Sequence, residues 1–537
     1  MQRFIPHIHF SSHKLLLTKT IVVFYCGFSL AQDTFNKRLH FDYFAAVLTS
    51  IIPTDTGYIA TGIIADTLPP YNTGAVFSKL DLGGDPVMVK TLTDTSKTYE
   101  PWFNSLTQLY DGSFMVTAAS FDPHENASLL KFGPQGDTIF SRSYRNPQFP
   151  GFTRIQPGGG LTHYTNGGFL VPTWANSFSD PFTISNVYVF KVDSLGMVEW
   201  DTFYTSAPMR ERPTSIVDDG NGNSWIGWTK NNWGIVFEDY TYQMGIVKID
   251  EYGEILWEYT SPDSLGLLDG PNQMVLLEDG SLVIATGIGV EIEVPGPVAN
   301  RVYFEKHLMK LTPDKEIEWE VTFPDVEPNS SSKLTNVIKL SDDSGFVAAG
   351  MEAEDLPGVD TYAVRGWVGK VDPYGQELWS RDYVGISGSN PRHTVYDLKE
   401  TPDGGVVLVG ESRGASSDGL PPQQAWVMKL DQFGCLVPGC HIVDDVGEAD
   451  FNISQLAVYP NPVSDYLNFQ LRSDRGSGDN HFRIVDANGR LVDSFTTTVH
   501  DNTTFIVPVW DWPPGTYFLQ LIDEKDGKVI SEKFIKH

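Results

Sequence analysis

Cysteine is nearly absent from this sequence, which has three in 537 residues. A chain of this length is far above the size at which a domain needs cross-links to stay folded. Cys26 lies in the N-terminal segment, while Cys435 and Cys440 stand close together. We expect these two to form a local disulfide, adding only ~2 kcal/mol because the closed loop is small. Apart from the adjacent His441, no histidine stands at zinc-ligand spacing, so we expect no metal site there.

Basic residues are also scarce, since 38 Lys and Arg face 68 Asp and Glu, giving a net charge of −30. No cluster of Lys or Arg interrupts this acidic background. A nucleic acid would therefore be repelled, and that class of partner is excluded. We interpret the acidity as favouring solubility outside the cell, with cation binding as the alternative.

Long apolar runs are missing beyond the first residues of the chain, so we expect no membrane span. The N-terminal segment resembles a secretory signal peptide, 1–31, with a basic start, an apolar stretch over Ile21 to Phe28 and small residues before Gln32. Cys26 raises the alternative of a lipoprotein. The bulky Phe24 and Tyr25 before it argue against a lipidation site.

Glycine, proline and aromatic residues are abundant, at 49 Gly, 34 Pro, 13 Trp, 22 Tyr and 32 Phe. Glycine and proline punctuate short strands, and aromatic side chains fill pleated faces. The composition therefore indicates an all-β fold.

An internal repeat organises most of the chain. A lysine, an apolar residue and usually an aspartate recur seven times, with spacings of 52, 60, 57, 62, 60 and 59 residues between the lysines Lys79, Lys131, Lys191, Lys248, Lys310, Lys370 and Lys429. Nine residues after the lysine, the second to sixth copies carry a large aromatic residue: Phe140, Trp200, Trp257, Trp319 and Trp379.

The spacing within each copy predicts a hairpin. Asp-x-x-Gly, as in Asp193 to Gly196, is a tight-turn signature because Asp bonds its own backbone and Gly accepts positive φ. The Trp beyond the turn should lie on the returning strand and pack between neighbouring blades. Copy five has Thr312 and Lys315 at the Asp and Gly positions, so we expect its turn to differ.

A second apolar hairpin precedes each lysine, so each copy holds four strands, the content of one β-propeller blade. Seven copies predict a seven-bladed propeller over 32–441. The last copy ends at Cys440 without its fourth strand. Residues 36–43 align with 376–383, which share a final Asp-Tyr, so we expect the N-terminal strand to close the seventh blade and remove its open edge.

A different module follows an acidic linker at 442–450. Over 451–537, alternating apolar strands separated by Asn-Gly and Pro-Gly turns predict a small β-sandwich. Its ordered motifs resemble the type A C-terminal sorting domain of proteins exported by the type IX secretion system of Gram-negative bacteria. The residues that carry the resemblance are Tyr459, Pro460, Asn461, Pro462, Gly489, Arg490, Pro514, Gly515, Tyr517 and Lys533.

This resemblance implies that the secretion machinery is a partner and that the protein reaches the cell surface or the extracellular medium. It also implies that the sorting domain is usually removed outside the cell. From the residues alone, a carbohydrate-binding accessory sandwich is the alternative. The ring more loosely resembles the propellers of such secreted proteins and of quinoproteins. This resemblance implies the fold and indicates nothing about an activity.

No catalytic motif stands out, and we expect neither cofactor nor metal. Asp219, Asn221 and Asn223 have the spacing of a calcium loop but lack its glycine and its bidentate acid, so a hairpin turn is the better interpretation. His163 and His393 are interpreted as packed or surface residues. The sequence thus predicts a non-enzymatic module binding a glycan or protein partner. The alternative is a hydrolase or lyase with an acidic site assembled from several blades.

Variable insertions between the two middle strands of a blade are where we expect function to reside, because loops differ between copies whereas the repeated Asp and Trp do not. These insertions cover Asp66 to Thr73, Asn231 to Tyr242, Val290 to Tyr303, Met351 to Val364 and Ser412 to Gln423.

Overall fold

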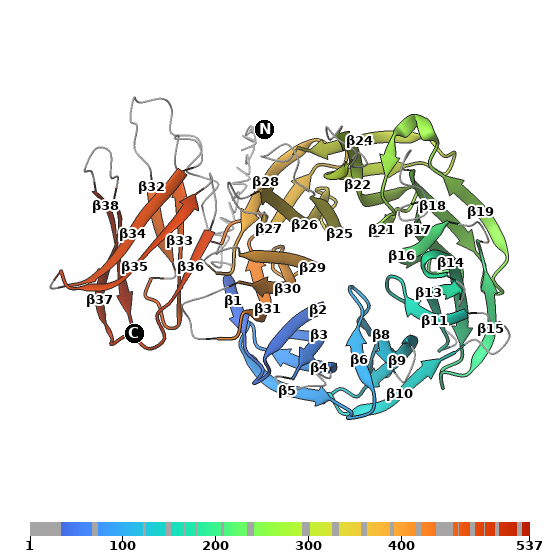
Figure 1. Cartoon of the computed structure of the whole chain (residues 1–537), viewed down its shortest axis with the longest axis horizontal. Coiled ribbons are helices and arrows are strands. Elements are labelled where there is room, and N and C mark those ends of the chain that lie inside the picture. Colours follow the sequence, from blue (N-terminus) through green and yellow to red (C-terminus); the bar gives the residue numbers. More distant parts are fainter. Residues whose placement is uncertain are drawn as a thin grey trace, which may run out of the picture.

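In the computed structural model of the protein, seven antiparallel blades form a closed ring and a two-sheet sandwich lies beside it (Figure 1). The prediction of an all-β, seven-bladed propeller followed by a sandwich is confirmed. The structure describes residues 34–66, 73–121, 125–145, 152–164, 167–177, 180–205, 209–232, 241–292, 301–324, 332–355, 362–386, 391–414, 420–436, 455–459, 461–472, 478–487, 489–499, 504–522 and 529–537.

The strands of each blade follow one another from the ring axis to the rim (Figure 1). Blade one holds β2 (Ala45–Thr54), β3 (Gly57–Ala65), β4 (Thr73–Leu80) and β5 (Pro86–Leu92). Blade two holds β6 (Thr98–Pro101), β7 (Thr107–Gln108), β8 (Phe114–Phe121), β9 (Glu125–Phe132) and β10 (Thr138–Tyr144). Blade three holds β11 (Phe152–Pro157), β12 (Thr162–His163), β13 (Phe169–Ser177), β14 (Asp180–Val192) and β15 (Val198–Phe203).

The remaining blades repeat this order. Blade four holds β16 (Arg210–Asp218), β17 (Ser224–Asn231), β18 (Tyr242–Ile249) and β19 (Ile255–Thr260). Blade five holds β20 (Leu267–Leu268), β21 (Gln273–Leu276), β22 (Leu282–Ile292), β23 (Arg301–Leu311) and β24 (Ile317–Phe323). Blade six holds β25 (Lys333–Lys339), β26 (Phe346–Asp355), β27 (Tyr362–Val371) and β28 (Glu377–Tyr383), and blade seven begins with β29 (Arg392–Glu400), β30 (Val406–Arg413) and β31 (Gln423–Leu430).

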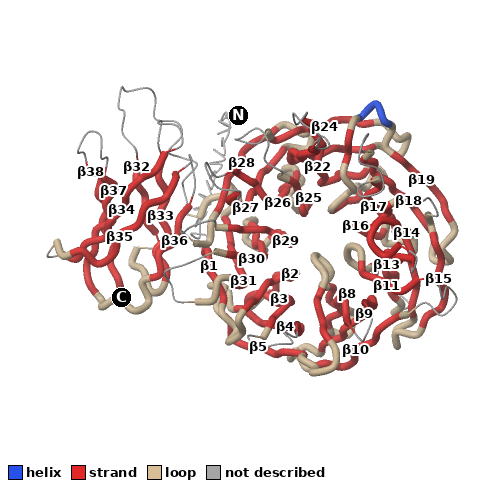
Figure 2. The backbone as a smooth tube through the Cα atoms, viewed as in Figure 1, coloured by secondary structure: helices blue, strands red, loops and turns tan. Residues whose placement is uncertain are grey.

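Burial changes from the middle to the rim of each blade. The middle strand β8 is buried along nearly its whole length, because neighbouring blades cover both of its faces. The outer strand β5 is mostly exposed. Within the described residues the only helix is the 3-10 turn η1 (Asp263–Leu265), and Figure 2 shows strands and loops elsewhere.

The predicted Asp-x-x-Gly turns form as expected. Asp431, for example, accepts hydrogen bonds at Oδ1 from the backbone N–H groups of Phe433 (2.9 Å) and Cys435 (2.7 Å). Gly434 has φ +72°, and a β-carbon there would lie 2.6 Å from the Trp379 ring of the preceding blade. The glycine is therefore required both by the turn and by the aromatic residue packed on it.

The turn of blade five was expected to differ, and this expectation is wrong. Lys315 adopts φ +70°, the conformation that glycine has in the other blades. The Lys315 N–H donates to the Thr312 carbonyl at 2.9 Å, and the Thr312 hydroxyl accepts from the Glu316 N–H at 3.2 Å. The ring imposes one turn geometry on all copies, and this copy holds it with a residue that disfavours positive φ.

The seventh blade takes its outer strand from the N-terminal segment. Strand β1 (Phe35–Leu39) pairs antiparallel with β31, and Phe35 lies opposite Lys429 as Trp379 lies opposite Lys370. The alignment of 36–43 with 376–383 was therefore out of register by four residues. Phe35, and not Leu39, takes the Trp position, because the packing of a ring on a turn decides the register. A β-carbon at Gly84 in blade one would lie 2.6 Å from the Phe35 ring.

The C-terminal sandwich has one sheet of β32 (Gln455–Tyr459), β33 (Tyr466–Arg472) and β36 (Thr504–Pro508). Its second sheet has β34 (Gly478–Asp486), β35 (Leu491–Val499), β37 (Gly515–Ile522) and β38 (Val529–Lys536). Phe469, Phe482, Phe505 and Phe534 fill the core between the sheets. The predicted linker at 442–450 lies outside the described residues, so the domain boundaries stay predictions.

The predicted insertions are partly strand. In blade five, β22 and β23 continue as a ladder as far as the pair of Ile292 and Arg301. In blade six, β26 and β27 continue to the pair of Asp355 and Tyr362. The central parts of these insertions lie outside the described residues.

Replacement of Lys315 with glycine should stabilise the ring. Lys315→Gly relieves the positive φ, and the free energy of unfolding should rise by about 0.5–1 kcal/mol, even though the Lys315 ammonium over Trp257 is lost. Urea unfolding followed by tryptophan fluorescence measures this change.

The matched control is Gly375→Ala at the same turn position of blade six. It should destabilise the ring, because the added β-carbon would lie 2.6 Å from the Trp319 ring. If Lys315→Gly is no more stable than the wild type, the claim that Lys315 is strained at its positive φ is wrong.

Candidate functional site

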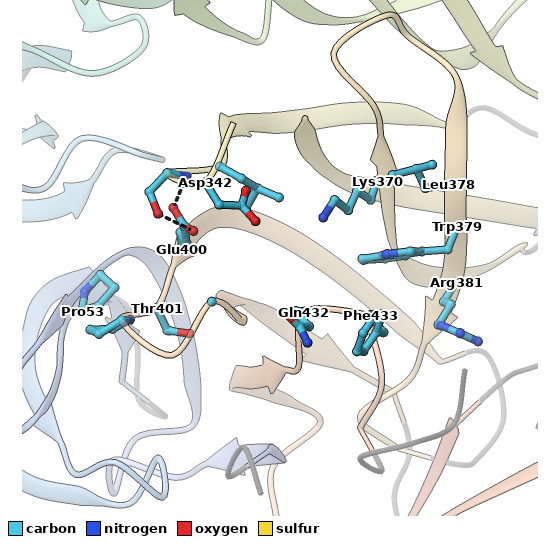
Figure 3. A pocket seen from close by; sticks show the side chains of 14 residues that line it. Pro53, Asp342, Lys370, Leu378, Trp379, Arg381, Glu400, Thr401, Gln432 and Phe433 are labelled. Carbon is cyan, nitrogen blue, oxygen red and sulfur yellow. Dashed lines mark hydrogen bonds between the residues drawn. The ribbon is translucent and has the colours of Figure 1, made fainter. Parts of the chain in front are cut away.

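A groove of about 840 Å³ lies between blades six and seven. Its walls are the rim strand of blade six and the turns at one edge of both blades. Figure 3 shows Trp379 and Lys370 on blade six facing Gln432 and Phe433 on blade seven. The lining residues are Pro53, Leu340, Ser341, Asp342, Lys370, Leu378, Trp379, Arg381, Glu400, Thr401, Pro402, Gly404, Gln432 and Phe433.

Trp379 differs from Trp200 and Trp257 in one hydrogen bond. In blades three and four, the indole N–H groups of Trp200 and Trp257 donate to the carbonyls of Glu251 (3.1 Å) and Pro313 (3.0 Å) in the next blade. Among the residues that the structure describes, the Trp379 indole N–H has no acceptor. The Trp319 N–H of blade five also lacks one, but it is buried. Its ring is half-buried and lies along the groove (Figure 3). Trp379 thus offers a bound molecule both an aromatic face and a donor.

Carboxylates line the other wall of the groove. Glu400 accepts hydrogen bonds from the Ser341 backbone N–H and hydroxyl, both at 2.9 Å, which ties the two blades together (Figure 3). The hydroxyl and N–H of Ser344 hold the pKa of Asp342 below its usual range. The Lys370 ammonium donates to the Ser344 hydroxyl at 2.9 Å. The groove therefore presents fixed hydrogen-bond acceptors on anionic side chains and a fixed donor on a cationic one.

Arg381 distinguishes this groove from the equivalent spaces in the other blades that carry a tryptophan, although blade two has Arg142 at the same position after Phe140. It stands two residues after the tryptophan, where blades three, four and five have Thr202, Tyr259 and Val321. Its Nε is buried without a partner among the described residues. A buried donor of this kind favours a ligand or water that supplies an acceptor.

The groove opens on the edge of the ring opposite to the variable insertions. Strands of a blade alternate in direction, so the turns at 341–344, 401–404 and 431–434 share one edge while the connections between the two middle strands lie at the other. The sequence predicted function at the opposite edge, in the variable insertions, and that prediction stays untested. It gave Trp379 only a packing role. The signal in the sequence is Arg381, the one arginine at this position among the copies that carry a tryptophan.

The two histidines singled out from the sequence are packed residues. His163 lies between Tyr110 and Phe169, with ring centroids 5.0 and 5.1 Å away. His393 is fully buried; its Nε2 accepts from the Ile386 N–H at 3.0 Å and its Nδ1 lies 3.2 Å from the Val364 carbonyl. Burial lowers the pKa of His393 to about 3.

The calcium-like segment is a hairpin turn, as the sequence indicated. Asp219 accepts from the backbone N–H groups of Asn221 (2.9 Å) and Asn223 (3.1 Å) and pairs with Lys248 at 3.2 Å. Burial alone would raise the pKa of Asp219, but these bonds outweigh it and hold the pKa below its usual value. The described residues contain no group of three His, Cys, Asp or Glu side chains able to hold a metal.

The sorting-motif residues gather mainly where the sandwich begins and ends. Asn461 donates through Nδ2 to the Lys533 carbonyl and accepts from the Ile535 N–H, both at 2.9 Å, beside Pro462. Tyr459 is buried, and its hydroxyl lies 3.2 Å from that of Thr504.

The other motif residues form the turns and the neighbouring strand. Gly489, with φ +78°, and Arg490 close the turn after β34. Pro514 and Gly515 lead into β37, where the Tyr517 hydroxyl donates to the Pro513 carbonyl at 2.7 Å. Pro460 lies outside the described residues.

Several sequence predictions fall partly or wholly outside the described residues. Cys435 is buried, but Cys440 is not described, so their disulfide stays a prediction. The same holds for the signal peptide at 1–31, including Cys26, and for His441. In the part of the chain that is described, no helix has the length and apolar character needed to cross a membrane.

Residues 457–537 match a family described as Secretion system C-terminal sorting domain. This match confirms the sorting domain that the motifs predicted. The protein is therefore sorted by the type IX secretion system to the cell surface or the extracellular space. No curated protein matches the chain.

Solved structures with a similar arrangement include PorZ, a surface component of the type IX secretion system of Porphyromonas gingivalis, at 10% identity and a TM-score of 0.29, covering 91% of this chain and 70% of that one. A protein of unknown function from Dyadobacter fermentans has 11% identity and a TM-score of 0.39, covering 60% and 93%. An α-L-arabinofuranosidase from Fusarium graminearum has 12% identity and a TM-score of 0.34, covering 74% and 98%. Scores and identities this low carry no argument about what this chain does.

The buried His393 should make the ring sensitive to acid. Its pKa is about 3 in the folded chain, below the value of about 6.5 in the unfolded chain, so the unfolded state binds more protons as the pH falls below 6.5. From pH 7 to pH 5 this single group should cost about 2 kcal/mol of stability. Between pH 7 and pH 5, the free energy of unfolding of a His393→Gln variant should fall by about 2 kcal/mol less than that of the wild type. Urea unfolding at the two pH values measures this difference.

His481→Gln, in the sandwich, is the control and should follow the wild type in the unfolding of the ring. Equal acid sensitivity of the wild type and His393→Gln would show that the imidazole is not kept neutral in the fold.

Proposed function

We propose that this secreted protein binds a glycan, without chemical conversion, in the groove between blades six and seven. The observation that carries the proposal is the Trp379 indole, a half-buried ring that lies along the groove and whose N–H has no acceptor among the described residues. The Trp319 N–H of blade five is also unpaired, but it is buried. Sugars present C–H faces that pack on aromatic rings and hydroxyl groups that exchange hydrogen bonds with polar side chains.

The size and chemistry of the groove support this ligand class. A volume of about 840 Å³ lies within the usual range for small-molecule sites and would admit a short oligosaccharide. Arg381, Lys370 and Gln432 supply donors, while Asp342 and Glu400 supply acceptors. Because cationic and anionic side chains are balanced here, an uncharged glycan fits better than a polyanion in a chain of net charge −30.

Binding is favoured over hydrolysis by the state of the carboxylates. A glycosidase needs one carboxyl group with a raised pKa to act as the acid. The pKa of Asp342 is instead lowered by Ser344, and both oxygens of Glu400 accept hydrogen bonds from Ser341. These groups are arranged to hold a ligand.

A pair of matched substitutions tests the groove. Trp379→Phe keeps an aromatic residue on the Gly434 turn, as Phe35 does on Gly84, but removes the free N–H and narrows the platform. Affinity for a glycan that binds the full chain should fall ~10-fold, the loss expected for one hydrogen bond and part of a stacking surface. Titration calorimetry against hits from a neutral-glycan array measures it.

The control is Trp257→Phe at the same position of blade four, whose indole N–H is already used within the protein. It should bind as the wild type does, and Arg381→Thr should weaken binding as Trp379→Phe does. Absence of any glycan hit, or equal losses for Trp379→Phe and Trp257→Phe, would remove the groove as a sugar site and leave a protein partner as the better hypothesis.

Deletion of residues 451–537 should stop export across the outer membrane. In a host with a type IX secretion system, the truncated chain should accumulate in the periplasm, while the full chain becomes accessible to protease added to intact cells. Normal surface delivery of the truncated chain would contradict the role of the sandwich in sorting.

A further inference from the structure

Val384 occupies a position that is polar or proline in every other blade. This position stands five residues after the aromatic residue of the rim strand, or after Met88 in blade one. The counterparts are all exposed or half-buried: Thr93, Arg145, Thr205, Pro262, Pro324 and His40. Val384 is only 4% exposed. Blade six therefore carries an apolar residue at its rim, and this residue is shielded from solvent.

The sandwich is what covers it. Val384 belongs to the same buried cluster as Leu467, Phe505 and Val507 of the sorting domain. Tyr383 of β28 pairs in parallel with Thr504 of β36. Tyr459 in turn packs with Tyr383 and Trp426 in a cluster that belongs to the ring. Each domain thus places residues in the buried cluster of the other.

This contact lies directly on the seam where the ring closes. The side-chain amide of Asn36, on the closing strand β1, donates to the Val384 carbonyl at 3.0 Å. The Trp426 indole N–H donates to the Asn36 side-chain oxygen at 2.6 Å. Figure 1 shows β1, β28 and β31 next to the sandwich. The residues that bind the sandwich therefore also hold β1.

We infer that the rim of blade six is a docking surface for this chain's own sorting domain, and that docking stabilises the pairing of the closing strand β1 with blade seven. The ring and the sandwich then unfold and open as one unit before the sorting domain is removed. Release of the sandwich uncovers Val384 and leaves the seam held by β1 alone. Before removal, the sorting domain serves the fold as well as the export of the protein.

The test uses the full chain and two matched arginine substitutions. Val384→Arg installs the residue that blade two has at this position, Arg145, so the blade itself tolerates it. Thr93→Arg introduces an arginine at the same position of blade one, away from the sandwich. Val384→Thr, the residue of blades one and three, is a milder variant that serves if the arginine prevents folding.

Hydrogen–deuterium exchange should separate the variants. In Val384→Arg, amides of β1 and of β36 should exchange ~10-fold faster or more, because local opening no longer has to break the shared cluster. Thr93→Arg should exchange like the wild type in both strands, and Val384→Thr should move in the direction of Val384→Arg. Wild-type exchange in both strands of Val384→Arg, or the same acceleration in Thr93→Arg, would overturn the inference.

Discussion

The packing of an aromatic ring on the turn of the next blade is the contact on which the rest of this protein depends. At Gly84, Gly253, Gly375 and Gly434, a β-carbon would lie within 3.0 Å of an aromatic ring of the preceding blade. The glycine serves the turn and the interface together, so neither can change alone. Because the same contact recurs around the ring, the last blade must provide it too, and Phe35 does so.

This contact explains which features the sequence could predict. The seven copies, the four strands in each and the closing N-terminal strand all follow from residues that recur, and recurrence is visible in one sequence. The register of β1 was missed because a shared Asp-Tyr pair was weighed above the aromatic residue, although only the aromatic residue meets the next turn. The turn of blade five was missed for a related reason: neighbouring blades fix the backbone, and Lys315 must then accept an unfavourable φ.

The groove was harder to predict, because its residues come together only through the ring. Trp379, Glu400 and Phe433 belong to three turns or strands of two blades, and nothing in their spacing indicates a shared wall. Trp379 also has a packing role like that of its counterparts. What separates it from Trp200 and Trp257 is an acceptor that is missing for its N–H, and a missing hydrogen bond leaves no mark in the sequence.

The groove and the sorting domain meet on one strand of this protein, β28. Successive residues of a strand point to opposite faces, so Trp379, Arg381 and Tyr383 of β28 share a face. Trp379 and Arg381 line the groove, and Tyr383 pairs with Thr504 of the sorting domain. Tyr383 lies about 13 Å along the strand from Trp379, at roughly 3.3 Å per residue. Tyr383 also donates its hydroxyl to the Gly434 carbonyl at 2.5 Å, on the same glycine that meets the Trp379 ring. The groove and the docking surface are therefore built on the same rigid contact, and a change in one has a direct physical route to the other.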